Sequence, residues 1–424
     1  MTITTMGDAN NIKKVLIAGA GPVGLFVALQ LARANIRSEI FEKSKELQTG
    51  PRAAGHYGPD LEVMKRAGMY EIFAEAAHFQ DGLVFRAPPV DDGKGGKTFG
   101  RDIATIREPQ LTLPQSAMVP LLATEIAKTG LVKIHFGKEV VGIKQDNNFV
   151  TLSTKDSKTG EVEQVKGEYL VGTDGGRSVV RSLLGIGFPG HTWKERIIAT
   201  NVTLKNEALA PIGSHLVVHP VKWGVVIPLE EPRLGEKSLW RYAIAVDSKD
   251  TRPDEELMTD ENIIASYDHL MVGSRPIQCR IEARAVYHIH QRLASTLRRG
   301  RVLLAGDAAH LCNPLGGMGL TSGILDSEAL SDALIMVINE VCSDQVLTLY
   351  SDLRRQVFGL FVDPMSTQNK YRIQNDADDL ERDDGFVRLL NRPGTQAMDA
   401  MRKLYEEQWR TDIRSKFLQR GGSH

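Results

Sequence analysis

The sequence predicts an α/β fold, in which a parallel sheet with helices is interrupted by a mainly antiparallel β-sheet and followed by C-terminal helices. Two short apolar runs, 14–18 and 301–305, lead directly into glycines, which is typical of strands buried on both faces of a parallel sheet. Between residues 185 and 297, stretches such as 240–246 have the composition and alternation of strands with one covered face. After Gly323 the pattern is mostly helical.

The segment 19–24, Gly-Ala-Gly-Pro-Val-Gly, lies between an apolar strand and a compact apolar helix. In such a unit Gly19 permits a tight turn, Gly21 lets a pyrophosphate approach the backbone, and Gly24 lets the helix pack on the strand. The helix N-terminus adds unpaired N–H groups and a partial positive charge. A second strand ends at Glu42, close to the offset of about 20 residues at which a carboxylate accepts ribose hydroxyls. The pattern favours a dinucleotide site over a glycine-rich turn without a ligand.

Two further segments fit the same site. The strand 301–305 is followed by Asp307 and then by the glycine-rich run 314–319, which leads into a helical pattern. Ligands of open α/β sheets lie at the carboxyl ends of the strands, where a carboxylate can hold a ribityl or ribose hydroxyl. The glycine-rich run places a second helix N-terminus nearby, which suits a flavin oxygen that gains negative charge on reduction. The remaining segment is 173–178, Thr-Asp-Gly-Gly-Arg-Ser.

These three motifs, in this order and spacing, resemble those of the class A flavoprotein monooxygenases, the family of para-hydroxybenzoate hydroxylase, over about residues 15–355. The resemblance implies bound FAD, and also NAD(P)H as a transient co-substrate, since the sequence has no second Gly-x-Gly-x-x-Gly unit. It further implies that reduced flavin and O₂ form a C4a-hydroperoxide, which hydroxylates a phenolic or heteroaromatic small molecule. The cofactor-binding residues that it implies are Gly19, Gly21, Pro22, Val23, Gly24, Glu42, Lys43, Arg52, Gln115, Asp174, Gly175, Asp307, Pro314, Gly317, Met318, Gly319 and Leu320.

The resemblance is weaker in the segment expected to bind the substrate. Arg241 is similar to the arginine that para-hydroxybenzoate hydroxylase places beside its mobile flavin, but the phenol-activating tyrosine of that enzyme would fall near Leu216. If a phenol must be deprotonated, a histidine or tyrosine of this segment could do it, since histidine titrates near the operating pH. Each is also plausible as a core or hydrogen-bonding residue. The candidate catalytic residues are Arg241, His215, His219, Tyr242 and Pro314.

The expected domain organisation follows the motifs. The FAD-binding domain comprises three parts, the last of which carries the flavin loop, and it is interrupted twice by substrate-domain strands. The boundaries are 1–68, 106–184 and 298–369 for the FAD-binding domain, 69–105 and 185–297 for the substrate-binding sheet, and 370–424 for a C-terminal helical region.

Composition excludes several other classes. The net charge of −1 gives no global field to recruit nucleic acid or an anionic membrane. Three widely spaced cysteines argue against a disulfide framework and for a reducing compartment, so we expect a cytoplasmic protein. There is no apolar run of about 20 residues, and the polar residues 1–11 contain no signal-peptide core. No metal site is expected, and a homodimer is compatible with the sequence.

Two alternatives stay open. The same fold also supports other flavin oxygenations, such as epoxidation or a Baeyer–Villiger reaction, and sequence alone does not separate these from hydroxylation. The second alternative is a non-catalytic flavin-binding protein, against which the intact glycine-rich run 314–319 argues.

Overall fold

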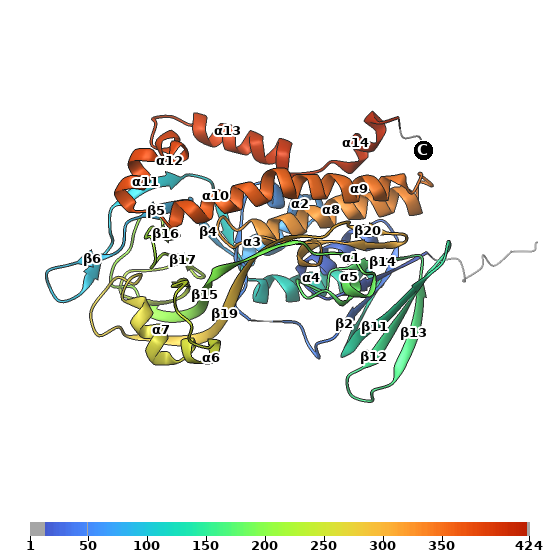
Figure 1. Ribbon diagram of the computed structural model, residues 1–424, viewed down its shortest axis with the longest axis horizontal. Helices are drawn as coiled ribbons and strands as arrows, with labels where there is room; N and C mark the ends of the chain where they lie inside the picture. Colours follow the sequence, from blue (N-terminus) through green and yellow to red (C-terminus); the bar gives the residue numbers. More distant parts are fainter. Residues whose placement is uncertain (1–12, 49, 422–424) are drawn as a thin grey trace, which may run out of the picture.

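A six-stranded sheet forms one half of the molecule in the computed structural model, which describes residues 13–48 and 50–421 (Figure 1). The expectation for residues 1–11 therefore lies outside the described residues. The strand order is β10-β2-β1-β14-β21-β20, with all pairs parallel except β20 and β21. The strands are β1 (Lys14–Ala18), β2 (Arg37–Glu42), β10 (Val132–Phe136), β14 (Tyr169–Gly172), β20 (Arg298–Arg299) and β21 (Val302–Leu304).

Apolar helices cover this sheet. In β1 the residues from Val15 to Ala18 are fully buried, because the strand lies between β2 and β14 with helices packed against the sheet. The helix α1 follows the first glycine segment, with Pro22 in its first turn, where the missing N–H costs nothing. The main covering helices are α1 (Pro22–Arg33), α4 (Gln115–Thr129), α5 (Val179–Leu183), α8 (Met318–Ile338) and α9 (Gln345–Val357).

The second large sheet has eight strands in the order β22-β19-β15-β18-β17-β16-β5-β8. It is mixed rather than mainly antiparallel as expected, because β16 pairs in parallel with β5 while the other neighbours run antiparallel. The parallel pair arises where the chain returns to a strand contributed by the earlier segment 83–86. The strands are β5 (Leu83–Arg86), β8 (Asp102–Ile106), β15 (Gly190–Lys205), β16 (His215–Val217), β17 (Gly224–Pro228), β18 (Lys237–Val246), β19 (Cys279–Leu293) and β22 (His310–Leu311).

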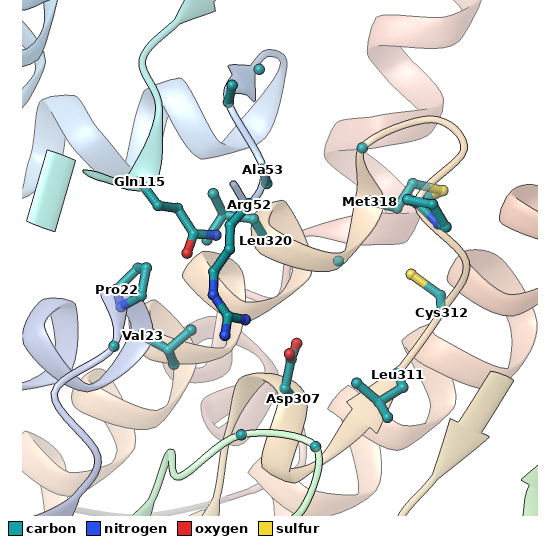
Figure 2. A pocket seen from close by; sticks show the side chains of 18 of the residues that line it. Pro22, Val23, Arg52, Ala53, Gln115, Asp307, Leu311, Cys312, Met318 and Leu320 are labelled. Carbon is teal, nitrogen blue, oxygen red and sulfur yellow. The ribbon is translucent and has the colours of Figure 1, made fainter. Parts of the chain in front are cut away.

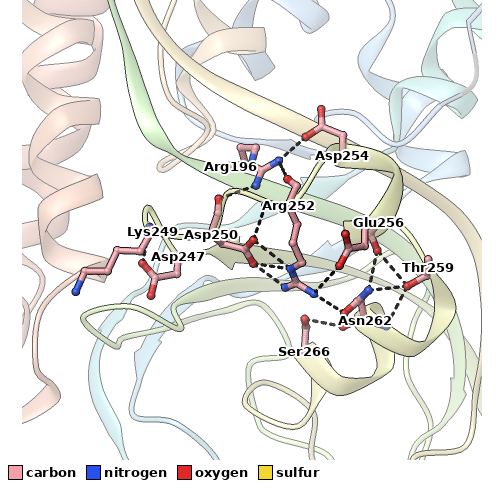
Figure 3. A network of polar contacts seen from close by, with 10 residues as sticks. All are labelled: Arg196, Asp247, Lys249, Asp250, Arg252, Asp254, Glu256, Thr259, Asn262 and Ser266. Atoms are coloured by element: carbon pink, nitrogen blue, oxygen red, sulfur yellow. Dashed lines mark hydrogen bonds and ion pairs between the residues drawn. The ribbon is translucent and has the colours of Figure 1, made fainter.

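One face of the eight-stranded sheet is covered by α6 (Asp254–Leu257) and α7 (Asp260–Tyr267), whose apolar side chains pack on alternate residues of β15, β17 and β18. Polar contacts fix these helices to the strand β15 (Figure 3). Arg196 donates to Asp254 at 2.8 Å and to the Asp250 carbonyl at 2.9 Å, and Arg252 donates to Asn262 at 2.7 Å. This face is therefore closed by the chain itself.

The opposite face is covered by helices near the C-terminus, which lie above the strands in Figure 1. The C-terminal helices are α10 (Asp363–Ile373), α11 (Ala377–Asp383), α12 (Gly385–Leu390), α13 (Gln396–Leu404) and α14 (Ile413–Gln419), with π-helical turns at Phe358–Val362 and Tyr405–Trp409. Among the described residues, no helix combines the length and the apolar character needed to cross a membrane.

The remaining elements are short or peripheral. A three-stranded sheet of β11, β12 and β13 extends from the six-stranded sheet, and residues 92–96 form the tip of the hairpin β6–β7. These elements are β3 (Gly55–His56), β4 (His78–Gln80), β6 (Val90–Asp91), β7 (Lys97–Thr98), β9 (Gln110–Thr112), β11 (Lys138–Gln145), β12 (Val150–Asp156), β13 (Val162–Gly167), α2 (Pro59–Arg66), α3 (Tyr70–Ala76) and a 3₁₀ turn at Gly306–Ala308.

Candidate active site

A cavity of about 1040 Å³ runs between the two large sheets and is closed on one side by C-terminal helices. This volume is at the upper end of the range for small-molecule sites, so it accommodates a large ligand. The predicted cofactor residues that line it are Gly19, Gly21, Pro22, Val23, Glu42, Lys43, Arg52, Gln115, Asp174, Gly175, Asp307, Pro314, Gly317, Met318, Gly319 and Leu320. Segments far apart in the sequence therefore meet at one place.

The first glycine segment forms one end of the cavity. Gly19 has φ of +102°, a conformation that L side chains rarely adopt, and Gly21 begins α1 with open space where a Cβ would stand. Gly24 does not line the cavity. A Cβ there would lie 2.2 Å from the Gly19 carbonyl, so its role is close packing. The carboxylate of Glu42 accepts from the Ala20 N–H at 2.9 Å, which holds it at the loop.

The centre of the cavity holds three polar side chains (Figure 2). The carboxylate of Asp307 and the guanidinium of Arg52 point toward each other, and the Gln115 carboxamide lies nearby. No described residue donates a hydrogen bond to the Asp307 carboxylate. The surrounding walls raise the pKa of this carboxyl above its usual range by desolvation, which His310 and Arg52 oppose. The Asp307 carboxylate, which has no hydrogen-bond donor from the described residues, can therefore accept a hydrogen bond from a hydroxyl group of a ligand.

A buried carboxylate fixes the turn that carries Asp307. Asp326 of α8 accepts from the Gly306 N–H at 2.9 Å, from His310 Nε2 at 2.7 Å and from Arg354 Nε at 2.6 Å. Burial alone would raise the pKa of Asp326, but His310 and Arg354 hold it below its usual value. Arg354 also donates to the Trp409 carbonyl at 2.7 Å, so the turn is tied to the C-terminal segment.

The middle motif is joined to the third one. Asp174 caps α5, since its carboxylate accepts from the N–H groups of Val179 and Val180 at 2.7 and 3.1 Å. Arg181 of the same helix donates to the Gly176 carbonyl at 2.8 Å and to the Ala308 carbonyl at 2.9 Å. The second motif therefore acts largely by holding two loops of the cavity together.

The glycine-rich loop 314–319 is held by its neighbours. Gly317 has φ of +64° and precedes α8, so the N–H groups of the first turn of that helix face the cavity side. The Tyr57 hydroxyl donates to the Gly316 carbonyl, and Asn369 Nδ2 lies 3.5 Å from the Leu315 carbonyl. Sequence analysis missed both of these contacts, because neither Tyr57 nor Asn369 belongs to a motif.

Two side chains of the eight-stranded sheet contact the backbone of the segment 51–52, which carries Arg52. Arg241 of β18 donates to Asn201 Oδ1 at 2.6 Å and to the Arg52 carbonyl, and the Tyr287 hydroxyl donates to the Pro51 carbonyl. Burial lowers the pKa of Arg241 to about 10, so the side chain remains charged near neutral pH. Arg241 thus holds the backbone of the residue whose guanidinium enters the cavity.

Tyr242 lies outside the cavity, which corrects the sequence expectation. Successive residues of a strand point to opposite faces, so when Arg241 and Ala243 line the cavity, Tyr242 faces the other side. There its ring packs against Tyr267 of α7 at 5.3 Å between centroids. Desolvation by burial raises the pKa of Tyr242 well above its ordinary value, so it serves the core rather than acid–base chemistry.

The two candidate histidines are also outside the cavity. His215 is buried and its Nδ1 donates to the Gly213 carbonyl at 2.7 Å, while burial and the charge of Arg86 lower its pKa to about 3. His219 follows the end of β16, where Nδ1 accepts from two backbone N–H groups of the next turn. Both imidazole rings therefore form hydrogen bonds with nearby backbone groups and stabilise the local conformation of the chain. Among the described residues, no group of three His, Cys, Asp or Glu side chains could hold a metal ion.

The helix α10 supplies a wall of the cavity that the sequence did not reveal. Met365, Asn369 and Arg372 stand at positions i, i+4 and i+7, so they share one helix face, and all three line the cavity. The helices α12 and α13 add Phe386 and Met401, among others. In the sequence, this helix has the same pattern as any amphipathic helix. Only the tertiary fold shows that one of its faces covers the cavity.

The residues fit FAD. Gly21 leaves a space beside the N-terminus of a 12-residue helix that any side chain would fill, as a diphosphate requires. Asp307 offers a carboxylate without a donor from the described residues, at the carboxyl end of a strand. The positions of these two groups at one cavity correspond to the phosphate and ribityl parts of one dinucleotide.

Comparison with known proteins agrees with this geometry. Residues 13–364 match a family model described as an FAD binding domain. The chain is 33% identical over 361 residues to para-nitrophenol 4-monooxygenase of Pseudomonas sp. strain WBC-3, which covers 84% of this chain and 86% of the relative. It is 29% identical over 364 residues to 6-hydroxy-3-succinoylpyridine 3-monooxygenase of Pseudomonas putida strain DSM 28022 / S16, covering 84% and 88%.

A solved structure is similar throughout. The crystal structure of p-nitrophenol 4-monooxygenase from Pseudomonas putida DLL-E4 superposes with a TM-score of 0.79 at 30% identity, covering 92% of this chain and 98% of the other. The family match, the relatives and the fold agree over most of the chain. The protein is therefore an FAD-dependent enzyme that belongs to the class A FAD-dependent aromatic monooxygenases.

Proposed function

We propose that the protein hydroxylates a phenolic or heteroaromatic small molecule, with NAD(P)H as the transient reductant and O₂ as the oxygen source. The observation that carries this proposal is one continuous cavity, in which the dinucleotide-binding loops meet an apolar compartment on the eight-stranded sheet. The apolar strand residues that face α10 across the cavity suit the planar ring of an aromatic substrate. The similarity to monooxygenases of a nitrophenol and a hydroxypyridine supports an aromatic substrate.

Bound FAD, once reduced, would activate O₂ and supply one oxygen atom to the substrate. The residues of this chain hold the cofactor, orient the substrate and enclose both. Gly21 and Asp307 anchor the two parts of the dinucleotide, while Arg241 and Tyr287 fix the backbone that carries Arg52 into the cavity. The apolar strands and the C-terminal helices exclude water, which favours transfer of oxygen to the substrate over its loss as hydrogen peroxide.

The test is a turnover assay of the FAD-loaded protein with a panel of phenols and nitrogen heteroaromatics. NAD(P)H consumption, hydrogen peroxide and products are measured together, and ¹⁸O₂ labels the product. We expect consumption that is stimulated by one class of aromatic compound, with one labelled oxygen atom in a hydroxylated product. Consumption that yields only hydrogen peroxide with every compound would contradict the proposal. Labelled epoxides or lactones would favour the alternative oxygenations, and no consumption would favour a non-catalytic flavin protein.

A further inference from the structure

A cation at the edge of the apolar compartment has a hydrogen-bond donor that no described residue accepts. The sheet side of this compartment carries apolar residues at alternate positions of four strands, namely Ile197, Ala199, Val225, Ile227, Ala243 and Ile289. On the facing side, Arg372 of α10 lines the same cavity with its side chain only 13% exposed. A charged side chain so placed must be matched by specific partners.

Two of the three nitrogens of the Arg372 guanidinium are matched by the chain. Nε donates to Asp384 Oδ2 at 3.1 Å and Nη1 donates to Asn369 Oδ1 at 2.9 Å, and the guanidinium carbon lies 4.7 Å from the centroid of the Phe386 ring. These contacts fix the plane of the guanidinium. Nη2, which carries two N–H groups, donates to no acceptor among the described residues. The side chain is thus held rigidly with one donor edge unused.

The other acids near this compartment are occupied. Asp384 also caps α12, since its second oxygen accepts from the Phe386 and Val387 N–H groups at 2.9 Å each. Glu108, which lines the cavity as well, accepts from Arg402 Nε at 2.8 Å. Neither carboxylate accepts a hydrogen bond from Nη2 of Arg372, so that donor edge is available to a ligand in the cavity.

We propose that Arg372 binds an oxygen acceptor of the aromatic substrate, with the ring packed on the apolar strands. This inference rests on the proposed function and names the substrate class, which is an aromatic ring bearing an anionic or strongly accepting oxygen. The acceptor is the phenolate oxygen or a nitro, carboxylate or carbonyl substituent, since the planar guanidinium matches each of them. In an apolar pocket a small number of polar contacts fixes the orientation of the ligand, and Arg372 would supply one of them.

A short chain of contacts links this site to the flavin loop. Asn369 receives the Arg372 hydrogen bond with Oδ1, and its Nδ2 lies 3.5 Å from the Leu315 carbonyl. A Cβ on Gly316 would lie 2.4 Å from the same Nδ2, so the carboxamide packs closely against the loop. Between a ligand on Arg372 and the loop expected to cradle the flavin there is therefore only the side chain of Asn369. We expect binding of such a ligand to change the flavin absorbance.

The test compares equilibrium binding by the FAD-loaded wild-type protein, Arg372→Met, Arg372→Lys and the matched control Arg388→Met, whose arginine is exposed on α12 and does not line the cavity. The probes are 4-nitrophenol, 4-methylphenol and 4-nitroanisole, titrated by flavin absorbance. Loss of a charged hydrogen bond predicts a Kd about 10- to 100-fold higher in Arg372→Met. Arg372→Lys, which keeps the charge but not the planar fork, should fall between.

The probes separate the two sources of the oxygen. If Arg372 binds the substituent, Arg372→Met should bind 4-nitrophenol and 4-nitroanisole more weakly than the wild type and bind 4-methylphenol equally well. If Arg372 binds the phenolate, Arg372→Met should bind both phenols more weakly, with a larger loss above the pKa of each phenol. Its Kd for 4-nitroanisole should then equal that of the wild type. Wild-type Kd values for all probes in Arg372→Met with full FAD content would overturn the inference, as would an equal loss in Arg388→Met. Probe binding without oxygenation would contradict the proposed function alone, and absence of binding by the wild type would contradict both.

Discussion

Replacement of Asp326 by Asn tests whether the buried carboxylate organises the turn that carries Asp307. The carboxylate is fully buried and accepts from three donors, the Gly306 N–H, His310 and Arg354. An amide at this place keeps one acceptor oxygen and turns an NH₂ group toward a donor. At least one donor then loses its partner, and Arg354, itself 1% exposed, loses its counter-charge.

The structure sets the size of the effect. Breaking a buried ion pair from one side costs about 3–5 kcal/mol, a large share of the roughly 5–15 kcal/mol that stabilises a typical protein. With an unfolding entropy of about 2.1 cal/mol/K per residue over 424 residues, this lowers Tm by roughly 3–6 °C. The matched control is Asp344→Asn, whose carboxylate pairs with Arg298 but is 61% exposed, so a change below about 1 °C is expected.

Thermal melts of the FAD-free proteins at one scan rate measure this difference, because unfolding of a chain of this size is often irreversible. The pH dependence has a definite sign. The pKa of Asp326 is lowered in the folded protein, so the stabilisation is present above the ordinary value of 3.8 and is lost as pH falls through the folded value. The difference in Tm between the wild type and Asp326→Asn should be constant from pH 8 to about 5 and should become smaller below pH 3.8. An Asp326→Asn protein that melts with the wild type at pH 7 would refute the argument.

Three further predictions concern the cofactor. Gly21→Val fills the open space at the start of α1, so the purified protein should be colourless, and full FAD content would contradict the assignment. Asp307→Ala removes a charged acceptor and should weaken FAD binding roughly 10- to 100-fold by flavin titration, with Asp307→Asn between; unchanged affinity would assign the carboxylate another role. Arg241→Lys or Arg241→Ala should slow NAD(P)H-dependent flavin reduction in the presence of substrate while FAD content stays intact, as followed by stopped-flow absorbance. Wild-type reduction rates in both variants would limit Arg241 to a structural part.

The cofactor end of the cavity was predictable from sequence because its determinants are local. Gly19 has a positive φ that favours glycine, Gly21 leaves the space in which a diphosphate would lie, and the spacing of both relative to a strand and a helix is visible along the chain. Asp307 follows a buried strand directly, so its place at the carboxyl end of the sheet also follows from local pattern.

The substrate end was not predictable in the same way. Arg241 and Tyr242 were both candidates, yet neighbours on a strand face opposite sides, so only one of them could line the cavity. Which one does depends on the face that α6 and α7 cover, and that is a tertiary fact. Arg372 gave no local signature, since an arginine on an amphipathic helix usually faces water. The parallel pairing of β16 with β5 likewise depends on a contact between residues more than 100 positions apart.

The helix α10 begins at Asp363, and the family match ends at residue 364. The loops that meet at the cofactor end of the cavity thus lie within the residues that the family model matches, whereas Asn369 and Arg372 follow them. A substitution at Arg372 removes no direct contact with the glycine-rich loop, whereas a substitution at Asn369 does. The cavity is thus built from two separate stretches of sequence, and a substitution in the later one can reshape its α10 wall while the residues at the cofactor end keep their identity.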